Sequence, residues 1–222
     1  MAPAKAMIER YMVSTAPALA DRVIRGLGEH GVIALPTESF YGLAVDPFDR
    51  QALARLREVK HRSEGKPILV LIGHGSHLQS FVQNVPPAAT ALIHAFWPGP
   101  LTIVFPAAGG LSDVLTAGTG SVGIRLSAWQ PLVDLLRRVG PVTGTSANRE
   151  GMPPARTAEE VQHNLGDVLD LIVDAGPTPG GQPSTVIDVR GPIRIMRDGA
   201  IERSAIAAQL AVLDLSLDED SR

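Results

Sequence analysis

The hydrophobic residues of this chain recur with two different spacings. Leu19, Val23 and Leu27 stand four residues apart, which places them on one face of an amphipathic helix. The segment 51–60 also keeps a helical spacing, whereas residues 32–35 (VIAL) form a short apolar run that is typical of a buried strand. The same patterns predict further helices over 88–97, 131–140, 157–165 and 204–213, and further strands over 67–73, 101–105, 122–126, 141–146, 169–174, 185–189 and 193–196.

Local signals agree with the ends of these elements. Pro131 lies in the first turn of an expected helix and Gly140 directly after its last turn, which is the usual asymmetry between helix termini. Thr157 and Glu160 have the spacing of a capping box at the start of another helix. Helices and strands joined by short Gly- and Pro-containing connections predict an α/β fold. The irregular spacing of the strands favours a single twisted sheet with mixed parallel and antiparallel pairing.

The length and the hydrophobic content of the chain limit the number of domains that it can form. The chain has 222 residues, of which 45% are hydrophobic, so it can form one large domain or two small ones. No change of composition marks a boundary, and we expect a single domain over residues 15–213 with terminal tails at 1–14 and 214–222. The first 15 residues resemble no signal peptide, and no segment approaches the ~18 apolar residues of a membrane-spanning helix. The expectation is a soluble, cytoplasmic protein.

Charge and metal-binding residue types exclude several classes of function. The net charge of −3 and the isoelectric point near 6.1 argue against a protein whose whole surface attracts nucleic acid, so any site for a polyanion must be local. The chain contains no cysteine, which excludes disulfides and thiolate metal sites. None of the six histidines has the spacing of a metal-ligand motif, so no side-chain metal site is predicted.

The segment 60–67 (KHRSEGKP) concentrates positive charge. Lys60, Arg62 and Lys66 stand directly before an apolar run, where an unpaired buried charge would be costly. Charge runs of this kind are most often solvated loops. In an extended segment, however, Lys60 and Arg62 would project to the same side and converge on one point, as a phosphate site requires. The GxxxxGK[ST] pattern of a P-loop is missing.

Two further segments place polar residues in or directly after a predicted strand. The segment 36–44 (PTESFYGLA) follows a strand and carries three hydroxyl groups, Ser39 among them, and one carboxylate. It is either a ligand-binding loop or a polar turn. In 121–127 (SVGIRLS), alternation places Ser121 and Arg125 on one face. An arginine inside a strand requires a carboxylate, phosphate or carbonyl partner, unless the strand is an exposed edge.

The remaining polar segments use the same residue types. In 144–151 (GTSANREG), Ser146 and Asn148 could bind an anion or a sugar, or could stabilise an ordinary turn. Ser184 and Arg197 lie near the ends of later strands. No cysteine and no Ser–His–Asp arrangement accompanies these residues. Together they are typical of a site that binds and polarises phosphates by electrostatics rather than through a covalent nucleophile.

In chain order, the segments PTESFYGLA, KHR with KPILVLI, WPGPLT, SVGIRLS, TSANREG and PSTVIDV resemble the YrdC family over about residues 18–200. The most specific element is a Lys-x-Arg pair combined with a Ser-x-Asn pair, here Lys60/Arg62 and Ser146/Asn148. The family contains the threonylcarbamoyl-AMP synthases of tRNA modification. The resemblance implies a twisted mixed sheet, flanked by helices, around a large concave cavity with a positive lining.

The resemblance also implies a reaction and its partners. L-Threonine, bicarbonate and ATP would be joined into threonylcarbamoyl-adenylate, with release of pyrophosphate, so the enzyme would be a nucleotidyltransferase. Mg²⁺ would be held mainly through phosphate oxygens. The product would pass to a tRNA threonylcarbamoyl transferase complex, which modifies the adenosine beside the anticodon. Direct contact with tRNA is left open.

The resemblance assigns roles to individual residues. The catalytic pair is Lys60 and Arg62, which would face the Ser146–Asn148 loop with ATP phosphates between them and offset the repulsion between two anionic substrates. Two positions depart from the family pattern. Many relatives have threonine where this chain has Ser39, and some have histidine where this chain has Leu71. The group that deprotonates threonine is left open. The implied ATP-binding residues are Lys60, Arg62, Lys66, Ser121, Ser146, Asn148 and Arg197, and the threonine-binding residues are Ser39, Arg125 and Ser184.

Three alternatives accompany this hypothesis. The first is a paralogue without synthase activity, which loss of the two residue pairs would indicate, although both pairs are present. The second is a module that binds double-stranded RNA or tRNA, and the net charge of −3 argues against RNA affinity as its main role. The third is a carbamoyl-adenylate-forming domain of hydrogenase maturation, which the resemblance associates with much longer chains.

Overall fold

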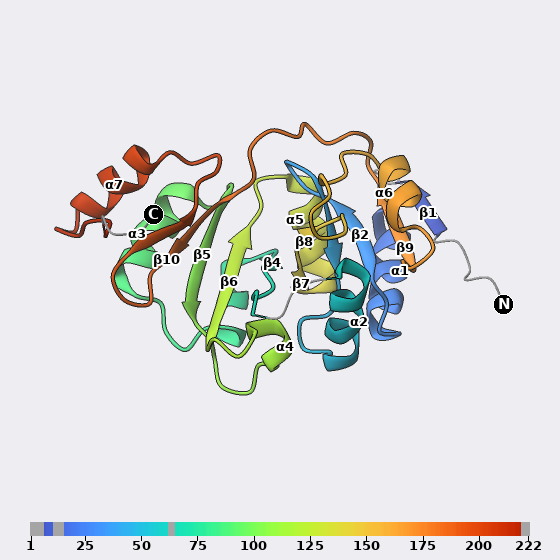
Figure 1. Cartoon of the computed structure of the whole chain (residues 1–222), viewed down its shortest axis with the longest axis horizontal. Helices are drawn as coiled ribbons and strands as arrows, with labels where there is room; N and C mark the ends of the chain where they lie inside the picture. The colour runs from blue at the N-terminus through green and yellow to red at the C-terminus, as the bar shows by residue number, and fades with distance from the viewer. Residues whose placement is uncertain (1–6, 11–15, 62–64, 219–222) are drawn as a thin grey trace.

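The computed structural model describes residues 7–10, 16–61 and 65–218 of the chain, and Figure 1 shows their arrangement. The helices are α1 (Ala16–Gly28), α2 (Arg50–Lys60), the 3₁₀ helix η2 (Gly75–Ser80), α3 (Pro87–Phe96), α4 (Asp113–Thr116), α5 (Gln130–Val139), α6 (Ala158–Leu165) and α7 (Arg203–Ala211). The strands are β1 (Met7–Arg10), β2 (Ile33–Pro36), β3 (Tyr41–Ala44), β4 (Val70–Ile72), β5 (Leu101–Pro106), β6 (Ser121–Leu126), β7 (Val142–Thr143), β8 (Thr145–Ser146), β9 (Leu171–Asp174), β10 (Thr185–Asp188) and β11 (Arg194–Arg197).

The strands form two sheets instead of the single sheet expected from the sequence. The five-stranded sheet has the order β1-β9-β2-β3-β8, and the six-stranded sheet has the order β11-β10-β5-β6-β4-β7. Each sheet contains parallel and antiparallel pairs. In Figure 1 most of the six-stranded sheet lies on the left and the five-stranded sheet on the right. The α/β class and the mixed pairing are therefore confirmed, and the number of sheets is corrected.

Gly144 marks the point where the chain passes from one sheet to the other. The sequence predicted one strand over 141–146, but β7 pairs with β4 in the six-stranded sheet and β8 pairs with β3 in the five-stranded sheet. The N–H of Gly144 donates to the carbonyl oxygen of Leu69 at 2.8 Å. A Cβ atom at Gly144 would lie 2.5 Å from Cγ of Leu71, whose side chain is fully buried. Only glycine permits this close crossing.

The variant Gly144→Ala is therefore expected to lower the free energy of unfolding by about 1–3 kcal/mol, because the new methyl group would overpack the buried Leu71 side chain. Urea denaturation of both proteins would measure the difference. Gly109→Ala is a matched control, because a Cβ at Gly109 would meet no atom within 4 Å. Equal stability of the two variants would contradict this account of the crossing.

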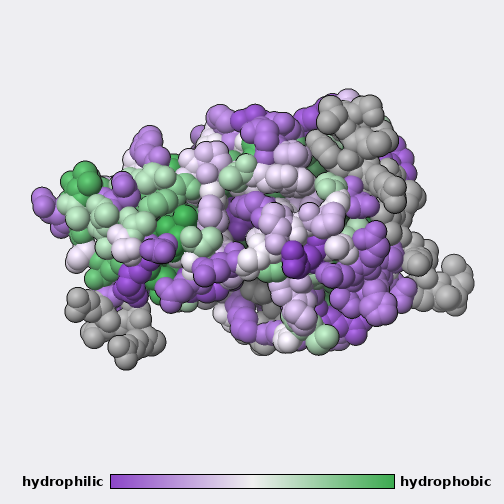
Figure 2. All heavy atoms as spheres, turned by 90° about the horizontal axis from the view of Figure 1, so that it is seen from above, coloured by the Kyte–Doolittle hydropathy of each residue, from purple (hydrophilic) through white to green (hydrophobic). Residues whose placement is uncertain are grey.

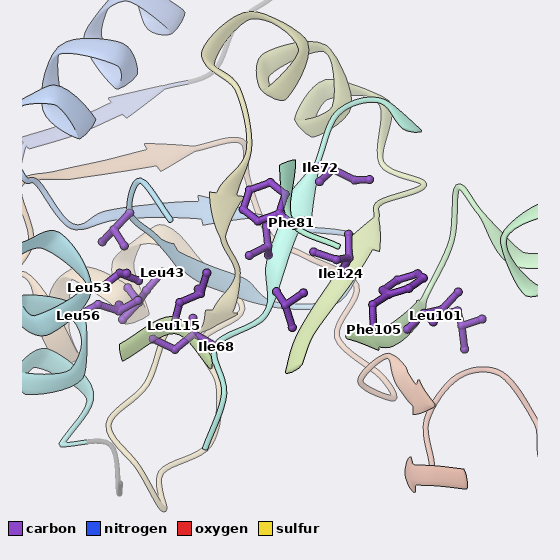
Figure 3. Packing of buried hydrophobic residues seen from close by; sticks show 14 of the residues in the cluster. Leu43, Leu53, Leu56, Ile68, Ile72, Phe81, Leu101, Phe105, Leu115 and Ile124 are labelled. Carbon is purple, nitrogen blue, oxygen red and sulfur yellow. The ribbon is translucent and has the colours of Figure 1, made fainter. Parts of the chain in front are cut away.

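The core consists of two clusters on opposite faces of β2. Ile33 and Leu35 pack with apolar residues of α1 and α5, whereas Ala34 belongs to a larger cluster that includes residues of α2, α3, β5 and β6. Figure 3 shows part of this larger cluster, with Leu53 and Leu56 of α2 close to Leu43 of β3. A strand that is buried on both faces has apolar residues at consecutive positions. This explains why the VIAL segment could be recognised as a strand from the sequence.

The structure corrects several boundaries. Strand β3 lies inside the segment 36–44, which its sequence had indicated to be a loop, and β4 covers only part of the predicted strand 67–73. Strand β1 lies in the expected N-terminal tail, where it pairs with β9. The Oγ1 atom of Thr157 accepts from the N–H of Glu160 at 3.1 Å, as a capping box requires. The Glu160 carboxylate, however, accepts from the N–H of Arg156 at 2.6 Å.

The surface differs between the two ends of the molecule. In Figure 2, hydrophobic residues gather at the end that carries α3 and α7, whereas hydrophilic residues dominate the opposite end. The contacts of α3 with α7 agree with this placement. Within the part of the chain that the structure describes, none of the helices combines the length and the apolar character needed to cross a membrane.

Candidate active site

One face of the six-stranded sheet forms the floor of a cavity of about 530 Å³. In β5, alternation turns Ile103 and Phe105 into the core and leaves Thr102 and Val104 in the cavity lining. The loop between β2 and β3 and the segment around Gly144 form further walls. Of the residues predicted from the sequence, those that line this cavity are Ser39, Ser121, Arg125, Ser146, Ser184 and Arg197.

Arg125 lies at the floor of the cavity with a carboxylate partner. It is only 5% exposed, and its Nη2 atom lies 3.2 Å from Oε2 of Glu38, to which the Ser127 hydroxyl also donates at 2.5 Å. Burial lowers the pKa of Arg125, and the charge of Glu38 opposes that shift. The partner expected for an arginine inside a strand is therefore Glu38.

Two polar atoms of this pair have no hydrogen-bond partner among the described residues. Nε of Arg125 and Oε1 of Glu38 are both buried and unsatisfied. Buried polar groups are rarely left without a partner unless a ligand or water completes them. Glu38 was not selected from the sequence, although it is the carboxylate of segment 36–44. The segment identified the right loop, but nothing local indicated that its carboxylate would meet β6.

Arg197 and Ser184 form a second polar group in the cavity. Nη2 of Arg197 donates to the Ser184 carbonyl oxygen at 2.8 Å and to its hydroxyl oxygen at 3.0 Å. Burial lowers the pKa of Arg197, and the positive charge of Arg125 lowers it further. Two arginines that repel each other in one cavity favour the binding of an anion between or beside them. The structure therefore brings three of the predicted residues together.

Ser39 and Ser121 occupy other walls of the cavity. Ser39 lies in the turn between β2 and β3, where its N–H donates to Oγ1 of Thr37 at 3.2 Å. Ser121 begins β6, and its hydroxyl lies 2.6 Å from the hydroxyl of Thr119, which also lines the cavity. Both serines add polar atoms to the lining of the cavity that also contains the two arginines.

The backbone conformation and the side-chain contacts of Lys60 differ from those expected from the sequence. It is the last residue of α2, and His61 follows in the left-handed conformation with φ of 50°, so the segment is not extended here. The Lys60 ammonium group is buried and donates to the carbonyl oxygens of Ser146 at 2.6 Å and Asn148 at 2.9 Å. It therefore contacts the Ser146–Asn148 loop directly, and its role at the ATP phosphates stays a prediction from the family resemblance. Neither Lys60 nor Asn148 is in the cavity lining.

Lys66 and Arg62 follow α2 in the sequence. The Lys66 ammonium group pairs with the carboxylate of Glu150 at an exposed position beside Gly65 and Pro67, which line the cavity. Arg62 falls outside the described residues, so its catalytic role stays a prediction from the family resemblance.

An acidic residue in the cavity lining was not predicted from the sequence. Oδ1 and Oδ2 of Asp188 accept from Nε and Nη2 of Arg190 at 2.9 and 2.7 Å, and both residues line the cavity. Burial alone would raise the pKa of Asp188, but its hydrogen bonds with Arg190 lower it on balance. No local signal distinguished this Asp-x-Arg sequence at the end of a strand from an ordinary turn.

Known proteins share this chain's sequence pattern over most of its length. A family model described as "Telomere recombination", the Sua5/YciO/YrdC domain, matches residues 26–199. Threonylcarbamoyl-AMP synthase of Thiobacillus denitrificans is 39% identical over 160 residues, covering 72% of this chain and 85% of that protein. The Bacillus subtilis protein of the same name is 36% identical over 185 residues, or 82% of this chain, but this chain spans only 54% of its length.

Solved structures show the same fold. The crystal structure of Pyrococcus abyssi Sua5 complexed with L-threonine has a TM-score of 0.87 and 27% sequence identity, covering 97% of this chain and 63% of that one. The structure of Escherichia coli YciO, at 22% identity, shares the fold with a TM-score of 0.81 over 90% of this chain and 99% of that one. The chain belongs to the Sua5/YciO/YrdC family.

Proposed function

We propose that this protein is an L-threonylcarbamoyl-AMP synthase. The observation that carries the proposal is the buried Arg125, which lies in the cavity with its Nε atom unsatisfied and with the second arginine, Arg197, near by. This arrangement suits an anionic amino-acid substrate beside a nucleotide. Relatives that match most of this chain are named for the same activity, and one solved relative is described with L-threonine.

The two substrate groups are assigned to two parts of the cavity. Arg125 with Ser39 and Ser184 would bind the carboxylate and polar atoms of threonine. The ATP phosphates would lie toward Ser121, Ser146, Lys66 and Arg197. In the reaction, the threonine nitrogen forms a bond to the carbon of bicarbonate with loss of water, which gives N-carboxythreonine. A carbamate oxygen of N-carboxythreonine then forms a bond to the α-phosphorus of ATP, and the bond between that phosphorus and the pyrophosphate oxygen breaks. Positive side chains offset the repulsion between the two anions, so no protein nucleophile is needed.

Lys60 acts as a positioning residue in this proposal. Its ammonium group holds the backbone of the Ser146–Asn148 loop, and Ser146 lines the cavity. The loop would therefore be fixed in place before ATP binds, which lowers the cost of ordering it during the reaction. Arg62 keeps its predicted role as the phosphate-facing cation.

Mg²⁺ enters the proposal as part of the MgATP substrate. Among residues 7–10, 16–61 and 65–218, no group of three or more His, Asp or Glu side chains is placed to hold a metal ion. Phosphate oxygens are the usual ligands of Mg²⁺ that accompanies a nucleotide.

The biological setting follows from the proposed product. The adenylate would be passed to a tRNA threonylcarbamoyl transferase complex in the cytoplasm. We further propose that the synthase unit corresponds to the predicted domain 15–213, with β1 added to its sheet. Direct tRNA binding is tested by measuring affinity at several salt concentrations, since contacts with phosphates weaken steeply as salt rises.

The proposed activity is measured as pyrophosphate release from ATP, Mg²⁺, L-threonine and bicarbonate. Release is expected only when all four are present, because N-carboxythreonine must form from threonine and bicarbonate before it can attack the α-phosphate of ATP. L-Valine in place of L-threonine is the matched control, since it keeps the size and loses the hydroxyl group. No pyrophosphate, or release that is independent of threonine, would contradict the proposal. Tight RNA binding without ATP consumption would favour the RNA-binding alternative.

A further inference from the structure

Thr102 lies at the centre of the polar floor of the cavity. It belongs to β5 between β10 and β6, and its register partner on β10 is Val186, two residues after Ser184. On the other side, Ile103 pairs with Ile124 of β6, the residue before Arg125. Thr102 is 4% exposed and lines the cavity, and it stands between β10, which begins directly after Ser184, and β6, which carries Arg125.

The Thr102 hydroxyl is paired with the Ser184 hydroxyl. Their oxygen atoms lie 2.9 Å apart, and either can be the donor. The Ser184 oxygen also accepts from Nη2 of Arg197 at 3.0 Å. No other hydrogen bond to either hydroxyl occurs among the described residues.

Counting hydrogens shows what this pair offers to a ligand. Each hydroxyl has one hydrogen to donate, and the mutual bond uses one of the two. If Thr102 donates to Ser184, the Ser184 hydrogen is free. If Ser184 donates to Thr102, the Thr102 hydrogen is free. In both cases one O–H donor remains on a pair whose two members line the cavity.

We propose that Thr102 is a further substrate-binding residue, which together with Ser184 donates one hydrogen bond to an oxygen atom of the amino-acid substrate. The inference rests on the proposed function and deepens it, because the pair lies beside Arg125, where the threonine carboxylate is assigned. Arg197 fixes the Ser184 oxygen from one side and Thr102 fixes it from the other. The donor is therefore held in place before the substrate arrives.

The test replaces Thr102 with valine, which keeps the shape and removes the hydroxyl. In pyrophosphate assays, Thr102→Val is expected to raise KM for L-threonine about tenfold, which corresponds to about 1.4 kcal/mol. The KM for ATP is expected to stay within about twofold, because the lost donor serves the amino acid. Thr102→Ser keeps the donor and is expected to restore KM for L-threonine to within about threefold of wild type.

Control variants separate the loss of this donor from a general effect of removing a threonine hydroxyl. Thr90→Val removes an exposed threonine hydroxyl on α3, outside the cavity lining, and is expected to leave both KM values unchanged. If Thr102→Val does not fold, Thr102→Ala carries the same test. If the wild type is active but Thr102→Val leaves the KM for L-threonine unchanged, or raises both KM values equally, this inference is overturned and the proposed function stands. A wild type without threonine-dependent pyrophosphate release would overturn the proposed function and this inference with it.

Discussion

Replacing Arg125 with lysine is expected to lower kcat/KM for L-threonine about 100-fold or more, with a smaller effect on the KM for ATP. The guanidinium group offers several N–H donors in a fixed plane, of which one nitrogen already contacts Glu38 at 3.2 Å and another, Nε, is unsatisfied. Lysine keeps the charge but cannot bind Glu38 and a substrate carboxylate in the same forked geometry. Steady-state pyrophosphate release at varied threonine and varied ATP would measure both parameters.

A second pair of variants separates binding from stability. Arg125→Met would leave Glu38 without its cationic partner and is expected to cost about 2–4 kcal/mol of unfolding free energy. The double variant Arg125→Met with Glu38→Gln removes both charges, so it should recover part of that stability while remaining inactive. An Arg125→Lys enzyme within threefold of wild-type kcat/KM would remove Arg125 from the threonine site.

Lys60→Met is expected to lower both stability and turnover. The methionine side chain matches lysine in length but cannot donate to the carbonyl oxygens of Ser146 and Asn148, which lie 2.6 and 2.9 Å from the Lys60 nitrogen. Losing hydrogen bonds from a buried charged donor to two backbone acceptors is expected to cost about 2–4 kcal/mol. The loop that carries Ser146 would lose its fixed position, so turnover is expected to fall about 100-fold. Urea denaturation and pyrophosphate assays would measure the two effects.

Lys66→Met is the matched control for stability. Lys66 is an exposed lysine nearby in the same chain segment and forms an ion pair with Glu150. Its removal is expected to change the free energy of unfolding by about 1 kcal/mol or less, since exposed ion pairs contribute little. If Lys60→Met were as stable as Lys66→Met, then Lys60 would not hold the loop, and a direct phosphate contact would again be the better interpretation.

Much of the fold was predictable because local periodicity reflects burial. The strand 122–126 and the helix 51–60 were predicted within a residue or two of β6 and α2, since their apolar spacing records which face packs on the core. The strand 141–146 was not, because its division between two sheets depends on Leu71, which lies far away in the sequence. A local pattern contains no information about such a neighbour.

The sequence by itself determined which segments line the candidate site, since the polar residues beside each strand and their order along the chain indicated both the cavity walls and the family. Only the tertiary structure decided which side chains meet. Arg125 meets Glu38, and Lys60 meets the backbone of the Ser146–Asn148 loop. The physical reason is that these contacts join residues more than 80 positions apart. Such contacts are set by how the two sheets pack, whereas spacing along the chain records only the local direction of each side chain.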